Sequence, residues 1–287
     1  MILHLLGLGT PDPSSERFGS AFLLEVGDEL IMIDCGPAAV YKMARLGKYP
    51  MQVNRLLFTH HHSDHNMDYP CFLLTRWDQD HGDRTKIPPL RVCGPPPTVA
   101  LTERLIGKEG AFREDLVARI EAPVSQLMHT NRGGSLPRWW PEYDVRDIEP
   151  GVVEENDRWK ITAVEVTHLE PWLIEYGYRV ETPEGVVAFT GDAGPCDGLD
   201  ELAAGADVLV MCCAHTGNLN PLTMAAVTGA PDVARVASNA GVKTVVLTHS
   251  PVGRGRPGNR EHVVATVAKG FDGQIIFADE LTTLNVP

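Results

Sequence analysis

Short apolar runs separated by turn-forming residues recur along the chain, a pattern that indicates β-strands more than long helices. In the first sixty residues the pattern predicts strands at 2–8, 20–26, 30–33 and 55–59 and a helix at 38–46. The second and third runs are separated by a short turn, so we expect them to pair as a hairpin.

The second half of the chain repeats one arrangement, in which an apolar, β-branched run ends on a polar side chain. Four such runs are present: 161–167 before His168, 186–190 before Gly191 and Asp192, 208–213 before His215, and 244–248 before His249. Loops at the ends of strands are common places for binding residues, because a rigid sheet holds them in position. The two halves share this order, which favours an α/β fold of two similar layers in one domain spanning 1–287.

One segment departs from the pattern. Residues 129–150 are rich in Gly, Pro, Arg and Trp and show no clear periodicity. Connections of this length are usually functional or disordered, so we predict a lid or insert. Trp139 and Trp140 could cap an apolar pocket, but anchoring of the segment to the core is the favoured interpretation.

Composition and charge narrow the class of protein. The chain has 287 residues, of which 43% are hydrophobic and 22% charged, as in folded globular domains. Its net charge of −13 shows no excess of basic residues of the kind that binds nucleic acid or an anionic membrane. The six cysteines show no CxxC spacing, and no apolar run approaches the ~18 residues of a membrane span. We therefore expect a cytoplasmic protein with no membrane contact.

Histidines cluster at the end of the fourth predicted strand. Four of the 11 histidines lie between positions 60 and 65, in the pattern H-x-H-x-D-H. Residues two apart in an extended segment point the same way, so His60, His62 and Asp64 share one side, His65 turns to another, and His61 points away. Nitrogen and carboxylate ligands without thiolate suit zinc, with manganese and iron as alternatives.

Four ligands do not fill two metal sites, so further ligands are required from later strands. His168, Asp192 and His249 each follow a predicted strand and are the candidates.

These motifs, together with Asp34-Cys35-Gly36, occur in the order seen in one large family. The chain resembles the metallo-β-lactamase superfamily over nearly its whole length. Within it, the chain is most similar to the tRNase Z and arylsulfatase-like branch, through Leu8-Gly9-Thr10, Gly177-Tyr178-Arg179 and Leu247-Thr248-His249-Ser250.

The resemblance implies a four-layer αββα sandwich with a dinuclear zinc site at one edge. It implies that one metal is bound by His60, His62 and His168, the second by Asp64, His65 and His249, and that Asp192 bridges them. Asp34 is expected to fix a turn behind the metals through hydrogen bonds. A hydroxide between the two metals is available at neutral pH, because bound zinc lowers the pKa of water from ~15.7 to about 7. This hydroxide would attack an ester or phosphodiester bond. Asp64 would orient the hydroxide or bind metal. His215 is the candidate for the proton donor to the leaving group or for a substrate contact.

The chain also departs from the tRNase Z pattern. Val227 lies near the place of that family's proton-donating histidine. The glutamate of the family's neighbouring motif would fall within Met211-Cys212-Cys213, where this chain has no glutamate. No tRNA-gripping arm is evident. Together with the negative charge, these departures favour a small-molecule substrate, anionic or aromatic, over RNA. The basic residues Arg254, Arg256 and Arg260 either meet an anionic group or form a solvated loop.

Three alternatives stay open at this point. The same metals could serve a lactonase or amidase, or the chain could be a metal-binding sensor without turnover. A homodimer is also compatible with the sequence.

Overall fold

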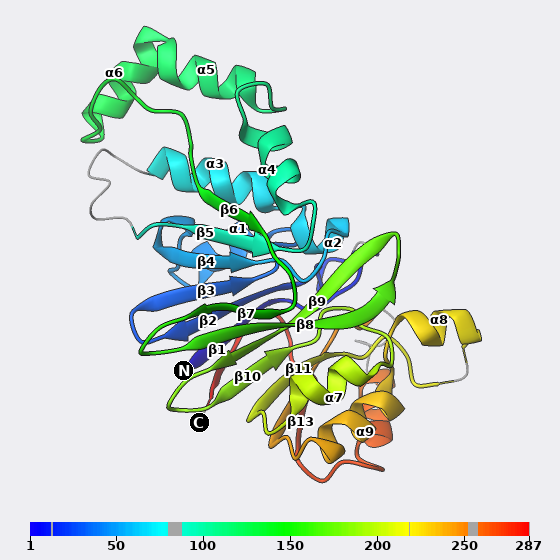
Figure 1. Ribbon diagram of the computed structural model, residues 1–287. Coiled ribbons are helices and arrows are strands. Elements are labelled where there is room, and N and C mark those ends of the chain that lie inside the picture. The colour runs from blue at the N-terminus through cyan, green and yellow to red at the C-terminus, as the bar shows by residue number, and fades with distance from the viewer. Residues whose placement is uncertain (13, 80–87, 218, 252–257, 287) are drawn as a thin grey trace.

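The computed structural model describes residues 1–12, 14–79, 88–217, 219–251 and 258–286 (Figure 1). Arg254 and Arg256 lie outside the described residues, whereas Arg260 is described and places its guanidinium 3.4 Å from Asp279 Oδ1.

Two seven-stranded mixed sheets form the centre of the fold. The first has the order β14-β1-β2-β3-β4-β5-β6, with bounds Thr282–Asn285, Ile2–Gly7, Ala21–Val26, Glu29–Ile33, Val53–Leu57, Arg91–Gly94 and Asp144–Asp147. The second has the order β13-β12-β11-β10-β9-β8-β7, with bounds Gln274–Ile276, Thr244–Thr248, Val208–Cys212, Val186–Phe189, Leu173–Glu181, Lys160–Leu169 and Gly151–Glu155. The strands predicted from the apolar runs in both halves are thus present.

Helices cover the outer faces of both sheets (Figure 1). Beside the first sheet lie α1 to α6 and the short 3-10 helix η1, with bounds Ala39–Arg45, Ser63–Asn66, Tyr69–Gln79, Thr98–Ile106, Arg113–Glu121, Pro123–Asn131 and, for η1, Pro50–Gln52. Beside the second lie α7 to α10, at Asp197–Ala203, Pro221–Ala226, Ala230–Asn239 and Asn259–Val267. The four-layer αββα sandwich expected from the sequence is confirmed.

The main core lies between the two sheets. It draws buried side chains from both, including the rings of Phe22 on β2 and Phe189 on β10, whose centroids are 5.5 Å apart. Two further apolar clusters lie between each sheet and its helices. Because the central strands of both sheets are buried on both faces, they read as nearly continuous apolar runs.

The segment 129–150 is more regular than the sequence indicates. Its first residues complete α6, and β6 adds an edge strand to the first sheet. The indole of Trp77 donates to the carbonyl of Trp139 (3.0 Å), and that of Trp140 donates to the carbonyl of Ile106 (2.7 Å). The two tryptophans thus anchor the segment, while its role as a lid stays a prediction.

Helices α5 and α6 project away from the sheets at the top of Figure 1. They are tied to α3 by Asp78, whose carboxylate lies 2.8 Å from Arg138, 3.2 Å from Arg119 and 3.4 Å from Arg132. Among the described residues, no helix has the length and apolar character needed to cross a bilayer.

Candidate metal centre

The histidine motif follows directly from the end of β4. The chain stays extended up to His62, with ψ 153° at that residue, and α2 then begins at Ser63. This change of conformation turns Asp64 and His65 away from the direction of the preceding histidines. One short segment therefore supplies ligands to two neighbouring positions.

The fold brings the seven predicted ligands together in two groups. In each group one ligand atom per residue lies within 4.8 Å of all the others. The first group is His60, His62, His168 and Asp192, and the second is Asp64, His65, Asp192 and His249. Both groups include the carboxylate of Asp192. They lie close together because the ends of β4, β8, β10 and β12, from which the ligands come, meet at one edge of the two sheets.

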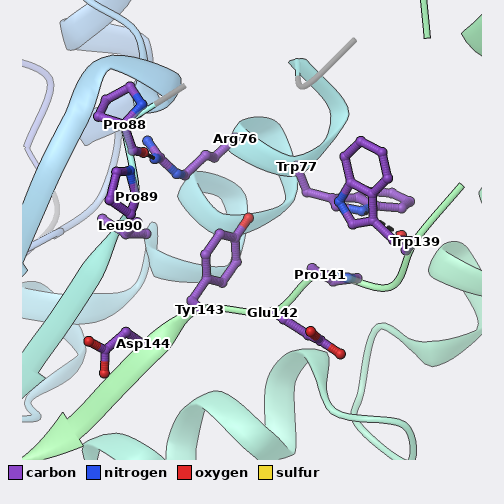
Figure 2. A pocket seen from close by; sticks show the side chains of 10 residues that line it. All are labelled: Arg76, Trp77, Pro88, Pro89, Leu90, Trp139, Pro141, Glu142, Tyr143 and Asp144. Atoms are coloured by element: carbon purple, nitrogen blue, oxygen red, sulfur yellow. Dashed lines mark hydrogen bonds between the residues drawn. The ribbon is translucent and has the colours of Figure 1, made fainter. Parts of the chain in front are cut away.

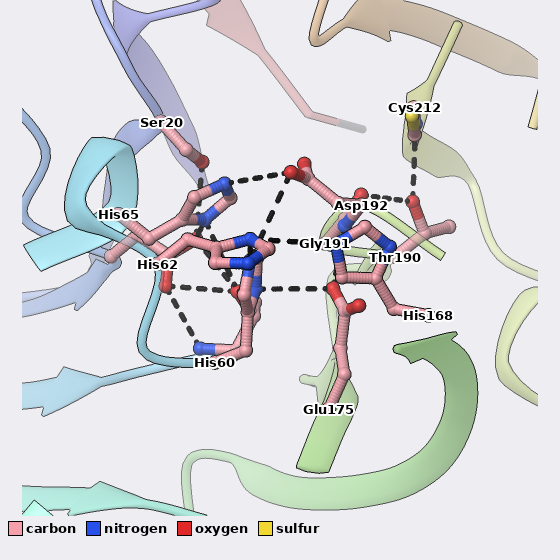
Figure 3. Close-up of polar contacts among 12 residues, drawn as sticks. Ser20, His60, His62, His65, His168, Glu175, Thr190, Gly191, Asp192 and Cys212 are labelled. Atoms are coloured by element: carbon pink, nitrogen blue, oxygen red, sulfur yellow. Dashed lines mark hydrogen bonds and ion pairs between the residues drawn. The ribbon is translucent and has the colours of Figure 1, made fainter. Parts of the chain in front are cut away.

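Asp192 is the shared member of the two groups, and Figure 3 shows its carboxylate facing His65. Its Oδ2 lies 3.1 Å from His65 Nε2, 2.8 Å from His249 Nε2 and 3.9 Å from His60 Nε2. His61, by contrast, points elsewhere and places Nε2 2.8 Å from Thr98 Oγ1. The separation of His61 from its neighbours follows the period-2 expectation for an extended segment.

The outer nitrogens of three imidazoles have hydrogen-bond acceptors that set their tautomers. His65 Nδ1 lies 2.7 Å from the Asp34 carboxylate and His168 Nδ1 2.7 Å from the carbonyl of Ala226. His60 Nδ1 lies 3.3 Å from the carboxylate of Glu175. With Nδ1 protonated in each ring, Nε2 carries a lone pair directed at the centre, as in histidines that bind metals.

The polar atoms at the centre lack hydrogen-bond partners. Both carboxylate oxygens of Asp64, Nε2 of His65 and both ring nitrogens of His249 are buried without a well-oriented hydrogen bond, although both Nε2 atoms face the Asp192 carboxylate. Burial of so many unsatisfied polar atoms is costly unless a cation binds them. The residues therefore fit two divalent ions, and the nitrogen and oxygen donor set fits zinc.

The charges within the cluster set the protonation of its imidazoles. Burial, together with the charges of His60 and His168, lowers the pKa of His62 to about 4. Burial also lowers the pKa of His65, but the carboxylates of Asp192 and Asp34 outweigh it and raise that pKa well above its usual value. The centre thus contains concentrated negative charge from carboxylates that suits a cation.

Asp34 organises the turn behind the ligands. Its carboxylate accepts hydrogen bonds from the Thr59 amide (2.8 Å), the Ser20 hydroxyl (3.1 Å) and His65 Nδ1 (2.7 Å). Its backbone is left-handed, with φ 57°, which is uncommon outside glycine. Nearby, a Cβ at Gly36 would lie 2.2 Å from the Asp64 carbonyl oxygen, so only glycine allows this approach.

Glu175 is a site residue that the sequence analysis missed. It is fully buried on β9, and its Oε1 accepts a hydrogen bond from the Asp192 amide (2.6 Å) as well as facing His60. Burial and the charge of Asp192 raise its pKa to about 8. The available signal was an acidic residue between the apolar residues Ile174 and Tyr176, two positions before Gly177.

His215 lies behind the ligands rather than among them. It is buried, its Nε2 donates to the carbonyl of Val227 (3.0 Å), and its Nδ1 accepts from the Gly217 amide (3.1 Å). The same loop supplies the Ala226 carbonyl that orients His168. These contacts hold the ring of His215 against the loop 226–229, and its role as proton donor or substrate contact stays a prediction.

Two of the cavities among the described residues are candidate substrate clefts. One, of about 300 Å³, touches the ligand Asp64. The other, of about 320 Å³, lies beside α3 and contains no ligand residue (Figure 2). Its base is Arg76, which donates to the backbone carbonyls of Pro50 (2.6 Å) and Val53 (2.9 Å). Proximity to the ligands therefore favours the first as the substrate cleft.

Comparison with known proteins agrees with the geometry of the centre. Residues 15–249 match the sequence profile of the metallo-beta-lactamase superfamily. Ribonuclease Z of Mycolicibacterium gilvum is 33% identical over 98% of this chain and 95% of its own length. In structure, the chain is similar to the metallo-beta-lactamase fold protein YhfI from Bacillus subtilis, with TM-score 0.72, 17% identity and coverage of 99% and 98%. It is also similar to the short form of human tRNase Z, with TM-score 0.69, 18% identity and full coverage of both chains.

One sequence-based expectation is corrected by these relatives. A small-molecule substrate was favoured and RNA disfavoured, yet the curated relatives that match nearly the whole chain are named ribonuclease Z. The physical reason is that a net charge of −13 describes the whole surface, whereas substrate binding depends on the local field at the site.

Proposed function

This chain is a hydrolase of the metallo-beta-lactamase superfamily, and from that premise we propose that it cleaves a phosphodiester bond of RNA at a dinuclear zinc centre. The observation that carries the proposal is the pair of four-residue groups that share Asp192. One ion is assigned to His60, His62 and His168, the other to Asp64, His65 and His249, and Asp192 contacts both.

When bound, the two ions lower the pKa of water and offset the charge that develops on phosphate oxygens. The chain itself fixes the geometry in which this occurs. Asp34 and the Ala226 carbonyl hold His65 and His168 in the tautomer that binds metal, and Glu175 holds both His60 and the backbone of Asp192. In the net reaction, a water oxygen bonds to phosphorus, the bond from phosphorus to a ribose oxygen breaks, and that oxygen takes up a proton.

RNA as the substrate is supported by the ribonuclease Z relatives and by one surface feature. Trp172 follows His168 by four residues at the tip of the β8–β9 hairpin, and 85% of its surface is exposed. The Glu170 carboxylate accepts a hydrogen bond from the His168 amide (2.9 Å), a local contact within the turn that leads from this ligand to Trp172. Exposed aromatic side chains are the usual platforms on which single-stranded bases stack.

We also propose that 1–287 forms one catalytic domain and that it acts in the cytoplasm. The first proposal is supported by the core that both sheets share. The second is supported by six free cysteines, as is usual in a reducing compartment.

The test is cleavage of a tRNA precursor that carries a 3′ trailer. We expect the zinc-loaded protein to cut it once near the end of the tRNA, a chelator to abolish the cut, and His62→Ala to lower the rate at least about 100-fold. His61→Ala is the matched control, because this neighbouring imidazole lies outside both groups, and its rate should stay within a few-fold. Absence of any cut, or an undiminished cut by His62→Ala, would contradict the proposal.

A further inference from the structure

The cavity beside Asp64 has the properties of a built binding site. It measures about 300 Å³ and lies between the segment after β1 and the start of α2. Four apolar residues form much of its described wall, namely Pro11, Phe18, Pro37 and Met67. Pockets for small organic groups are concave and mostly apolar in this way. Because a metal ligand forms part of the wall, whatever fills the cleft is adjacent to the reacting bond.

Phe18, which forms one wall of the cleft, is held in place by the buried side chains of Lys42 and Glu280. The Lys42 ammonium lies 4.1 Å from the centre of the Phe18 ring and donates to the Leu6 carbonyl (2.7 Å) and to Glu280. Glu280 in turn accepts hydrogen bonds from the Phe18 amide (2.6 Å) and the Leu8 amide (3.2 Å). Both charged side chains are only 7% exposed. This buried network fixes one wall of the cleft before any ligand binds, which reduces the entropic cost of binding.

The charges around the cleft disfavour a phosphate inside it. Arg17 is the one cation among its described lining residues, and it is only 6% exposed. Its guanidinium is directed into the protein, where it donates to the carbonyl of Ala278 (2.7 Å) and lies over the Phe277 ring. The acidic side chains of Asp12 and Asp64 also line the cleft. The occupant is therefore expected to be uncharged and flat, with apolar faces.

We propose that this cleft binds the nucleobase of a nucleotide that flanks the scissile phosphate. The inference rests on the proposed function, because it assigns a subsite to the same centre. A base has apolar faces for Phe18 and Met67, carries no charge, and is joined to the phosphate by a single ribose, which suits a cleft that touches Asp64. The cleft thus contributes affinity for nucleotides over phosphodiesters that lack a base.

The test isolates the base by comparing two ligands with the same phosphate. Cytidine 5′-monophosphate and ribose 5-phosphate are titrated into the zinc-loaded protein by calorimetry. We expect the nucleotide to bind about tenfold more tightly, the range expected for one stacked base. Met67→Glu, at a position that is 58% exposed, should bring this ratio to about one without unfolding the protein. Met128→Glu is the matched control, an equally exposed methionine on α6, and should keep the ratio.

The outcomes separate the two proposals. A ratio near one in the wild-type protein, or a ratio unchanged by Met67→Glu, would overturn the base subsite. A tenfold ratio that Met67→Glu removes supports the subsite, even if the precursor tRNA is not cut. In that case the failure belongs to the proposed RNA substrate and not to the cleft.

Discussion

Asp34 gives the sharpest test of how the chain orients its proposed ligands. Its carboxylate is fully buried and accepts hydrogen bonds from His65 Nδ1 and from the amide of Thr59. Asp34→Asn keeps the shape of the side chain but replaces one acceptor oxygen by an NH2 group. Whichever way the amide is turned, a donor then faces either the imidazole or the Thr59 amide.

The size of the effect follows from the hydrogen bonds that are lost. One buried donor left unsatisfied costs about 1–3 kcal/mol of folding stability. Partners that orient a metal-binding histidine typically change metal affinity 10- to 100-fold, which is about 1.4–2.8 kcal/mol. Because Asp34 contacts His65 and none of the first group, the affinity for the second ion should fall much more than that for the first.

The two zinc affinities are measured by competition with a chelator, and stability by urea unfolding of the metal-free protein. Asp207→Asn is the control. This carboxylate accepts the Val186 amide (2.8 Å) and pairs with Lys243, at the start of β11 and away from the ligands. Its zinc affinities should not change. If both zinc affinities of Asp34→Asn stay within twofold of wild type, the orienting role of Asp34 is refuted.

Three further predictions follow from the contacts. Glu175→Leu should weaken zinc binding 10- to 100-fold, since it removes the oxygen that accepts the Asp192 amide and faces His60; unchanged affinity in a zinc titration would contradict this. Burial raises the pKa of Asp78, but the hydrogen bond from Arg138 and the charges of nearby arginines outweigh it and hold that pKa below its usual value, so its stabilising effect is present above pH ~4 and is lost as pH falls further. Thermal unfolding of Asp78→Asn should therefore occur at a lower temperature than wild type at pH 7, and the gap should narrow as the pH falls below ~4; a constant gap would refute the assignment. Iodoacetamide at pH 8 should alkylate the exposed Cys71 in the native protein, whereas the buried thiols of Cys35, Cys93, Cys212 and Cys213 should react only after unfolding, as mass spectrometry would show, because burial shields them from the reagent.

The strands and the candidate ligands at their ends were predictable because both depend on local patterns, whereas the four-layer sandwich was expected from the resemblance to a known family. Buried strands appear as continuous apolar runs, and the polar residue after each run marks the edge of the sheet where the ligands meet. His60 and His62 share a direction because the segment stays extended until α2 begins.

Features that depend on contacts distant in sequence were not predictable in this way. Glu175 gains its role only because β9 places it beside Asp192 and His60. His215 ends an apolar run like the other candidates, but its backbone pairs with Gly229 and turns the ring toward the loop 226–229. The edge strand β6 is mostly exposed and has no apolar alternation, which is why it was read as part of a loop.

The dinuclear zinc centre is tested most directly by crystallising the zinc-reconstituted protein and collecting X-ray data at the zinc absorption edge. An anomalous-difference map then shows where zinc is bound. The account predicts two peaks per chain, one among His60, His62 and His168 and one among Asp64, His65 and His249, with Asp192 in contact with both. In Asp64→Ala, the second peak should weaken or disappear while the first remains. A map with no zinc at these residues, or with both peaks unchanged in Asp64→Ala, would contradict the central claim.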